Sequence, residues 1–366
     1  MKAAVEQEAF ARAVGRAELG GLRSAPIHGL VRLEAREAPQ ELVISAVAAT
    51  ASIVTRIPAE VRSPGVAVVL THALSAAARA MPVGGLLLSS SDKRLFVKST
   101  EGRTWSGAVS DPEWAAEPGW PGELRIVQLP QRALLTALAR TTHVAALVDR
   151  EDEVVVRAVR LEAREKRLTA IACARTLLAV SEHDLDEALE PWSATVGESG
   201  LGPLAELLDE VEKAKAPLEL ASDEHSVYMR GPATRADSRV PVVPFPDWKD
   251  LLEGFADEPA CTLKREPLLE SLRAAQAVQT TRDPGAEFQL RGGILTINRA
   301  DPDTDFTDQV PVEGASGAEV SFRASMPYLL HCLKAAPEDP RLSFATDGKC
   351  MKLDAGGYRA IIAIMK

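Results

Sequence analysis

The chain contains the heptapeptide Val31-Arg32-Leu33-Glu34-Ala35-Arg36-Glu37 twice, the second time as Val159-Arg160-Leu161-Glu162-Ala163-Arg164-Glu165. Roughly a third of the chain further on, residues 287–292 show the same alternation of apolar and polar residues. A second apolar run follows each copy, at residues 42–44, 168–171 and 294–297. Each pair of runs predicts two strands joined by a short turn. The pattern favours three tandem copies of one unit.

The second half of each copy supports the repeat independently. Residues 72–97, 202–229 and 326–353 each predict a helix followed by a strand, a polar turn and a strand. The first halves have nearly the same order, so each third is itself expected to be a doubled unit. We therefore predict an α+β fold with helices on one side of antiparallel sheets, divided into domains 1–121, 122–254 and 255–366. The expected helices are 5–17, 71–81, 130–140, 201–211, 267–278 and 326–335.

Composition limits the classes of function. At 366 residues and 46% hydrophobic the chain can bury a large core. The four scattered cysteines, without Cys-x-x-Cys spacing, are expected to be free thiols. The apolar runs are too short to span a bilayer, which predicts a cytoplasmic protein without a membrane partner. The net charge of −10 argues against a basic surface that wraps nucleic acid.

Three motifs invite an enzymatic interpretation, and each has a structural one that we prefer. Ser90-Ser91-Asp92-Lys93 lies between two apolar runs and predicts a hairpin turn rather than a serine–lysine pair. Residues 301–305 resemble a calcium loop but lack its later glycine and glutamate. His331 and Cys332 are neighbours that face different sides of a predicted helix. A hydrolase using one of these pairs stays open as an alternative, but we predict no catalytic residues, no metal site and no cofactor.

The order of these elements resembles a known family. Three tandem copies, the ending at residues 358–366, Phe245-Pro246-Asp247-Trp248, Gly20-Gly21 and Pro26-Ile27-x-Gly29 together resemble the bacterial sliding clamp, the beta subunit of the replicative DNA polymerase. The resemblance covers essentially the whole chain. It implies a nucleoid-associated protein, a head-to-tail homodimer that closes into a ring around double-stranded DNA. Such a protein is a non-enzymatic processivity factor that recruits DNA polymerase, clamp loader and other clamp-binding peptides.

The resemblance also suggests which residues serve each surface. Because a ring is held on DNA by topology, loose phosphate contacts suffice. The expected DNA-facing residues are the basic residues of the predicted helices and one loop: Arg12, Arg16, Arg23, Arg79, Arg132, Arg140, Lys213, Lys215, Arg273 and Lys334. The alternative for each is an ordinary solvated side chain.

Partner peptides of the family bind an apolar groove. Its expected members here are Val156, Cys173, Leu178, Pro246, Leu251, Met351, Ile361, Ala363, Ile364 and Met365, and a core position is the alternative for each. The chain departs from the family at Ala172-Cys173-Ala174-Arg175-Thr176-Leu177-Leu178, where polar residues are lost, and at its last four residues. These departures also fit a specialised paralogue that acts as a protein-interaction scaffold with an altered groove.

The dimer interface implied by the resemblance joins Trp105 and its strand to the helix that carries Gln276 and Ala277. The family tends to present large aliphatic side chains at these helix positions. Smaller and more polar residues reduce the apolar area that association buries. The sequence therefore predicts a weak dimer.

Overall fold

The structure is a computed structural model, and it describes residues 1–20, 29–48, 50–91, 93–110, 120–146, 157–174, 176–317 and 319–365. The chain forms two compact units, Met1–Gln131 with Val196–Val240, and Arg132–Thr195 with Pro241–Lys366. Within the described parts, no helix combines the length and apolar character that crossing a bilayer requires.

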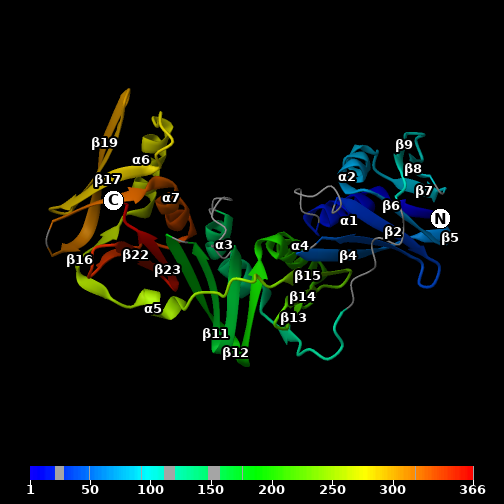
Figure 1. The fold of residues 1–366 in the computed structure, drawn as a ribbon, viewed down its shortest axis with the longest axis horizontal. Helices are drawn as coiled ribbons and strands as arrows, with labels where there is room; N and C mark the ends of the chain where they lie inside the picture. The colour runs from blue at the N-terminus through cyan, green and yellow to red at the C-terminus, as the bar shows by residue number, and fades with distance from the viewer. Residues whose placement is uncertain are drawn as a thin grey trace. The chain divides into compact units, whose positions relative to one another are not determined.

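The first unit holds two antiparallel sheets and three helices among its described residues. The smaller sheet has the order β5-β1-β7-β8-β9 and the larger one β10-β13-β14-β15-β4-β3-β2-β6. Its elements are β1 (Lys2–Glu6), α1 (Gln7–Gly20), β2 (Leu30–Arg36), β3 (Glu41–Val47), β4 (Ala51–Pro58), β5 (Glu60–Ser63), β6 (Gly65–Leu70), α2 (Thr71–Ala80), β7 (Gly85–Ser90), β8 (Arg94–Ser99), β9 (Thr104–Ala108), β10 (Val127–Gln128), α4 (Glu198–Ala214), β13 (Glu219–Ser222), β14 (Ser226–Arg230) and β15 (Thr234–Arg239). Helix α1 lies between α2 and α4 (Figure 1).

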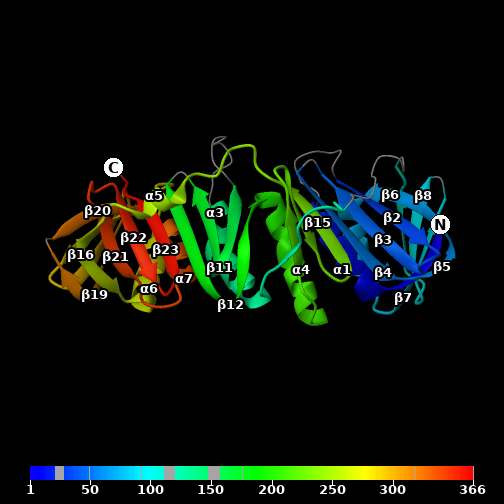
Figure 2. The same ribbon diagram turned by 90° about the horizontal axis from the view of Figure 1, so that it is seen from below.

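The second unit is built on one sheet of order β11-β12-β23-β22-β21-β16-β19-β18-β17-β20. Its elements are α3 (Gln131–Ala146), β11 (Ala158–Ala174), β12 (Leu177–Gly197), α5 (Trp248–Leu252), β16 (Phe255–Leu263), α6 (Arg265–Ala277), β17 (Gly285–Arg291), β18 (Ile294–Asp301), β19 (Thr304–Ser316), β20 (Val320–Ser325), α7 (Met326–Ala335), β21 (Arg341–Ala345), β22 (Cys350–Ala355) and β23 (Tyr358–Ala363). Strands β21, β22 and β23 run side by side (Figure 2), and α6 packs against α7.

The repeated heptapeptide forms a strand in both places. In β2 and at the start of β11 the valine, leucine and alanine are buried, while the intervening arginine and glutamate reach solvent. The two copies even form the same ion pair, Arg32–Glu34 at 2.6 Å and Arg160–Glu162 at 2.7 Å. Identical sequence therefore gives an identical half-buried strand, as its period of two requires.

Strands from neighbouring thirds of the sequence pair directly. β15 from the middle third pairs with β4 from the first, with Thr234 opposite Thr55. β12 from the middle third pairs with β23 from the last, with Leu178 opposite Ile361. The elements of the middle third are thus divided between the two units, and the three-domain division stays a prediction.

All six expected helices are present; α7 has the expected bounds, and the other five have shifted ends. Helix α1 begins at Gln7 instead of Val5, because Val5 belongs to β1 and lies opposite Leu86 of β7. The short helix α5 was not expected. Its N-terminus is capped by Asp247, whose side chain accepts a hydrogen bond from the Lys249 backbone N–H.

A buried carboxylate joins three elements of the first unit. Glu210 of α4 is 8% exposed and accepts hydrogen bonds from the Thr234 hydroxyl at 2.6 Å and from the backbone N–H groups of Ala233 and Thr234. Its second oxygen lies 2.5 Å from the guanidinium of Arg16 on α1. The network satisfies the buried charge and fixes α4 against both β15 and α1.

We expect Glu210→Ala to lower the free energy of unfolding of the chain by about 3 kcal/mol, since it removes the acceptor of the Thr234 hydroxyl and of two backbone N–H groups and leaves Arg16 with only the more distant carboxylate of Glu206. Urea unfolding followed by circular dichroism measures this change. The matched control is Asp209→Ala, which removes only an exposed ion pair with Lys213 and should cost about 0.5 kcal/mol or less. Equal losses in the two variants would contradict the role given to Glu210.

Candidate functional site

An apolar pocket of about 400 Å³ opens on the second unit. Four segments form its walls: the end of β11 and start of β12, the α5 region, the turn between β21 and β22, and β23. The lining residues are Cys173, Ala174, Thr176, Leu177, Leu178, Asp250, Leu251, Glu253, Gly254, Phe255, Ala345, Thr346, Asp347, Cys350, Ile361 and Ala363. We call this pocket the groove.

The floor of the groove is a buried apolar cluster. Ile171, Leu178, Val180, Trp248 and Ile361 are each less than a tenth exposed and pack together. Pairing of β12 with β23 sets Leu178 directly opposite Ile361, so both side chains rise from the same face of the sheet. Trp248 of α5 packs against the same cluster. The pairing register of β12 and β23 therefore positions the side chains of the floor.

The C-terminal segment is held beside the groove by main-chain hydrogen bonds. The N–H of Ala363 donates to the carbonyl oxygen of Thr176 at 2.9 Å, and the N–H of Ile364 donates to that of Lys349 at 2.8 Å. The N–H of Met365 donates to the carbonyl oxygen of Arg323, also at 2.8 Å. Three separate segments therefore fix this end of the chain.

The groove brings together about half of the residues expected for it. Cys173, Leu178, Leu251, Ile361 and Ala363 line it. Pro246, Ile364 and Met365 are half-buried and lie outside the lining, and Val156 lies outside the described residues.

Met351 is the one expected groove residue that the structure contradicts. It is fully buried and pairs with Ile362, on the opposite face of the sheet from the groove. The groove face of β22 instead carries Cys350, which lies opposite Ala363. The sequence could have predicted this difference between Cys350 and Met351, because neighbouring side chains in a strand point to opposite faces of the sheet.

Other groove residues were missed by the sequence interpretation. Phe255, Ala345, Thr346 and Asp347 come from β16 and from the turn after β21. The backbone N–H of Thr346 donates to the carbonyl oxygen of Gly254 at 3.0 Å, which brings these two segments together. No local pattern in the sequence signals that contact.

The basic residues expected to face DNA are found in different environments. Arg16 is a correction: it is only 12% exposed at its side chain and is ion-paired with Glu210, a partner from α4. Arg140 is half-buried, and desolvation lowers the pKa of its guanidinium. Arg23 lies outside the described residues. The remaining expected cations are exposed: Arg12, Arg79, Arg132, Lys213, Lys215, Arg273 and Lys334.

Two of the exposed cations have acidic partners on helices. Arg79 pairs with Glu18 at 2.7 Å, and Lys213 pairs with Asp209 at 2.6 Å. Helix α4 carries five carboxylates, at 198, 206, 209, 210 and 212, against the single Lys213. By contrast α3 and α7 carry Arg132, Arg140 and Lys334 and no carboxylate. The basic character is therefore concentrated on α3 and α7.

The residues expected at a dimer interface lie at two exposed sheet edges. Trp105 is half-buried on β9, the last strand of its sheet, and its ring lies over Gly107. Gln276 and Ala277 are exposed at the end of α6, beside the start of β19, where the Thr304 hydroxyl donates to the Val278 carbonyl at 2.9 Å. From Thr304 to Pro311, β19 pairs only with β18 among the described strands, because its pairing with β16 starts at Val312.

The motifs that invited an enzymatic interpretation are structural. The hydroxyl of Ser90 accepts a hydrogen bond from the Met1 amino group at 2.9 Å, and Ser90 ends β7 in the expected β7–β8 hairpin. Asp301 ends β18 at the expected hairpin with β19 and pairs with buried Arg299.

The His331–Cys332 pair is likewise not set up for nucleophilic chemistry. Cys332 is fully buried, and burial raises the pKa of its thiol to about 12. The ring of His331 stacks on that of His143 with centroids 5.8 Å apart. The part of the chain that the structure describes holds no cluster of three or more histidine, cysteine, aspartate or glutamate residues suited to a metal ion.

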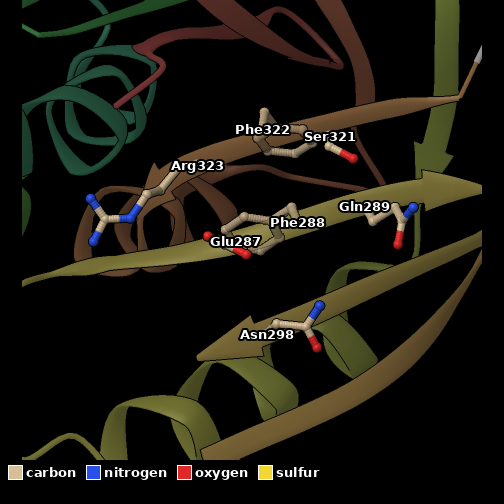
Figure 3. A pocket seen from close by; sticks show the side chains of 7 residues that line it. All are labelled: Glu287, Phe288, Gln289, Asn298, Ser321, Phe322 and Arg323. Atoms are coloured by element: carbon tan, nitrogen blue, oxygen red, sulfur yellow. The ribbon is translucent and has the colours of Figure 1, made fainter. Parts of the chain in front are cut away.

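A second pocket of about 360 Å³ lies on the face of β17, β18 and β20 and is lined by Glu287, Phe288, Gln289, Asn298, Ser321, Phe322 and Arg323 (Figure 3). The rings of Phe288 and Phe322 are buried and stacked, with centroids 5.1 Å apart. Arg323 is ion-paired with Asp283. Its remaining lining is the polar set Glu287, Gln289, Asn298 and Ser321, which contrasts with the apolar floor of the groove.

Comparison with solved structures identifies the fold. The DNA polymerase III beta subunit of Thermotoga maritima is 17% identical with a TM-score of 0.87, over 100% of this chain and 99% of that chain. The beta subunit from Pseudomonas aeruginosa is 17% identical with a TM-score of 0.84, over the whole of both chains. A sliding clamp from Pseudomonas aeruginosa bound to griselimycin is 18% identical with a TM-score of 0.84, over 100% of this chain and 99% of that chain.

No protein-family model and no curated protein sequence matches the chain. The structural similarity spans the full length at high TM-score, so the chain has the fold of the bacterial sliding clamps. This confirms the α+β fold expected from the repeats.

The two groove thiols give a direct test of the site geometry. Cys173 and Cys350 are half-buried at the groove, whereas Cys261 and Cys332 are buried. We expect a maleimide to modify two cysteines in the native chain and four in denaturant, counted by intact mass. Burial raises the pKa of both groove thiols, so the labelling rate should rise about tenfold per pH unit between pH 7 and 8, while both remain mostly protonated.

Peptide mapping identifies the modified residues and serves as the control. Rapid native labelling of Cys332, whose pKa is raised furthest by burial, would contradict the packing described here.

Proposed function

We propose that this chain is a DNA sliding clamp: a non-enzymatic ring that encircles double-stranded DNA and tethers polymerases and other DNA enzymes. The observation that carries the proposal is the full-length sliding-clamp fold together with a preformed apolar groove. A fold supports several functions, so the site has to support the assignment as well. The groove does so, because it offers a concave apolar floor with polar groups at its rim.

The groove is the proposed docking site for clamp-binding peptides of the polymerase, the clamp loader and other partners. Leu251, which is 46% exposed, and the nearly buried pair Leu178 and Ile361 offer an apolar surface for large side chains of a peptide. Met351 is left out of this proposal because it faces the core.

DNA contact is proposed to come from exposed cations on the helices. Arg132 and Lys334 lie on helices without carboxylates, and Arg12, Arg79, Lys215 and Arg273 add to them. Arg16 is left out because its side chain is only 12% exposed and is paired with the buried Glu210, whereas the side chain of Arg79 is 62% exposed despite its pair with Glu18. A ring needs only weak contacts that move from phosphate to phosphate, and a chain of net charge −10 is compatible with that mode.

Two copies are proposed to close the ring head to tail through the free edges of β9 and β19. Exposed strand edges pair readily with another strand. The charges are largely complementary: β19 and its preceding turn expose Asp303, Asp305 and Asp308, whereas β8 and the turn before β9 expose Arg94, Lys98 and Arg103 against the one carboxylate Glu101. Opposite charges across such an edge favour this orientation and disfavour like-to-like pairing. The helix end with Gln276 and Ala277 flanks the same edge.

We expect Asp305→Lys with Asp308→Lys to abolish retention on DNA, because like charges then face each other across both interfaces of the ring. The measurement loads the protein onto nicked circular duplex with a clamp loader and counts the protein that stays bound after gel filtration. The unmodified chain should be retained on circles and should slide off when the circles are cut.

Adding Lys98→Glu and Arg103→Glu to the same chain restores opposite charges and should restore retention. The control variant, Asp186→Lys on the exposed part of β12, should behave like the unmodified chain. Retention that survives linearisation would show ordinary affinity for DNA and would sink the proposed function.

A further inference from the structure

The rim of the groove is acidic although its floor is apolar. Asp250 and Glu253 stand on one side, around exposed Leu251, and Asp347 stands in the turn between β21 and β22. Among the described residues that line the groove, none is a lysine, arginine or histidine. The charged part of the described lining is therefore entirely negative.

The three rim carboxylates are not equivalent. Asp347 is neutralised by its neighbour, since its Oδ2 lies 3.0 Å from the Lys349 ammonium and its Oδ1 accepts from the Lys349 backbone N–H. The side chains of Asp250 and Glu253 form no hydrogen bond or ion pair with any described residue. Two carboxylates next to an apolar surface thus lack a counter-charge among the described residues.

The two lysines on segments next to the rim, Lys249 and Lys352, place their ammonium groups over aromatic rings. The Lys249 ammonium lies over the Trp248 ring, 5.7 Å from its centroid, and that of Lys352 lies over the Phe255 ring at 4.9 Å. Such cation–π contacts hold the ammonium groups at the faces of floor and wall residues. Neither of these two lysines therefore forms an ion pair with Asp250 or Glu253.

We propose that the groove selects extended peptides in which large apolar side chains are flanked by lysine or arginine, with the cation placed against Asp250 and Glu253. The inference rests on the proposed function in one respect, that the groove docks peptides. Apolar residues of the peptide fill the floor between Leu178, Leu251 and Ile361. The flanking cation then forms charge-assisted hydrogen bonds at a partly desolvated rim.

A peptide with acidic residues beside its apolar centre is expected to be repelled by the rim. A carboxylate beside Asp250 and Glu253 places like charges together at a surface from which the bound peptide excludes water. Specificity for basic flanks then comes from repulsion of acidic ones as well as from attraction. The neutral floor contributes equally to both kinds of peptide.

The experiment compares two fluorescent peptides of identical length and identical leucine–phenylalanine centre, one flanked by lysine and arginine and one by aspartate and glutamate. Fluorescence anisotropy with the full-length protein gives their dissociation constants. We expect the basic peptide to bind at least tenfold more tightly at low salt, with the difference shrinking as salt is added. Asp250→Asn with Glu253→Gln should reduce the difference to about twofold or less.

Two variants separate the rim from the floor. Leu251→Ala, at an exposed position, should weaken both peptides by a similar factor. Asp186→Asn with Glu187→Gln, two exposed carboxylates of β12, should change neither affinity and controls for net charge. Equal binding of the two peptides, tighter binding of the acidic one, or no binding of either would overturn the proposal.

Failure here is distinguishable from failure of the clamp function. A chain that is retained on circular DNA yet shows no preference for basic flanks keeps the proposed function and loses this inference. A chain that prefers basic peptides but slides off intact circles keeps a peptide-docking groove without acting as a clamp.

Discussion

Pairing between β12 and β23 is the interaction on which the candidate site depends. These strands come from different thirds of the sequence, and five consecutive residue pairs, from Leu177 opposite Ile362 to Ser181 opposite Tyr358, fix their register. A slip of one residue would turn Leu178 and Ile361 away from the groove and expose the opposite face of the sheet. The β15–β4 pairing in the first unit also joins neighbouring thirds of the chain. Through these two pairings, strands from neighbouring thirds of the chain form continuous sheets.

Charge is distributed in a way that the net value of −10 conceals. Carboxylates gather on α4, at the start of β19 and at the rim of the groove, whereas α3 and α7 have cations and the β8–β9 edge has three. Each location has its own consequence: Glu210 anchors α4, the acidic start of β19 is proposed to face the cations of β8 in a second copy, and Asp250 and Glu253 have no partner among the described residues. Short-range electrostatics of this kind act on specificity and orientation more than on total affinity.

Most of the fold was predictable from the sequence, because its signals are local. Both copies of the heptapeptide show the apolar–polar alternation of a strand. Helical periodicity predicted six helices, most of whose ends lie within a few residues of the observed ones. The β1 strand ahead of α1 was lost because Val5 also suits a helical face, and its pairing with Leu86 is a distant contact. Helix α5 was too short for periodicity to reveal.

The site was less predictable, since it depends on distant contacts. Of the residues that the resemblance suggested for the groove, Cys173, Leu178, Leu251, Ile361 and Ala363 line one pocket, and their role in binding stays a prediction. Arg16 was misplaced because its ion-pair partner lies 194 residues away and no local pattern reveals it. The acidic rim could not be read from the sequence, because Asp250 lies on α5 and Asp347 in the turn between β21 and β22, and only the fold brings them to the same opening.

The most direct test of the account is the mass of the unmodified chain in solution, measured by sedimentation from nanomolar to micromolar concentration. The account predicts a reversible equilibrium between a 39.2 kDa chain and a species of twice that mass, with salt shifting it toward the single chain. A single chain at every concentration would contradict ring closure through β9 and β19, and so would a larger open-ended assembly.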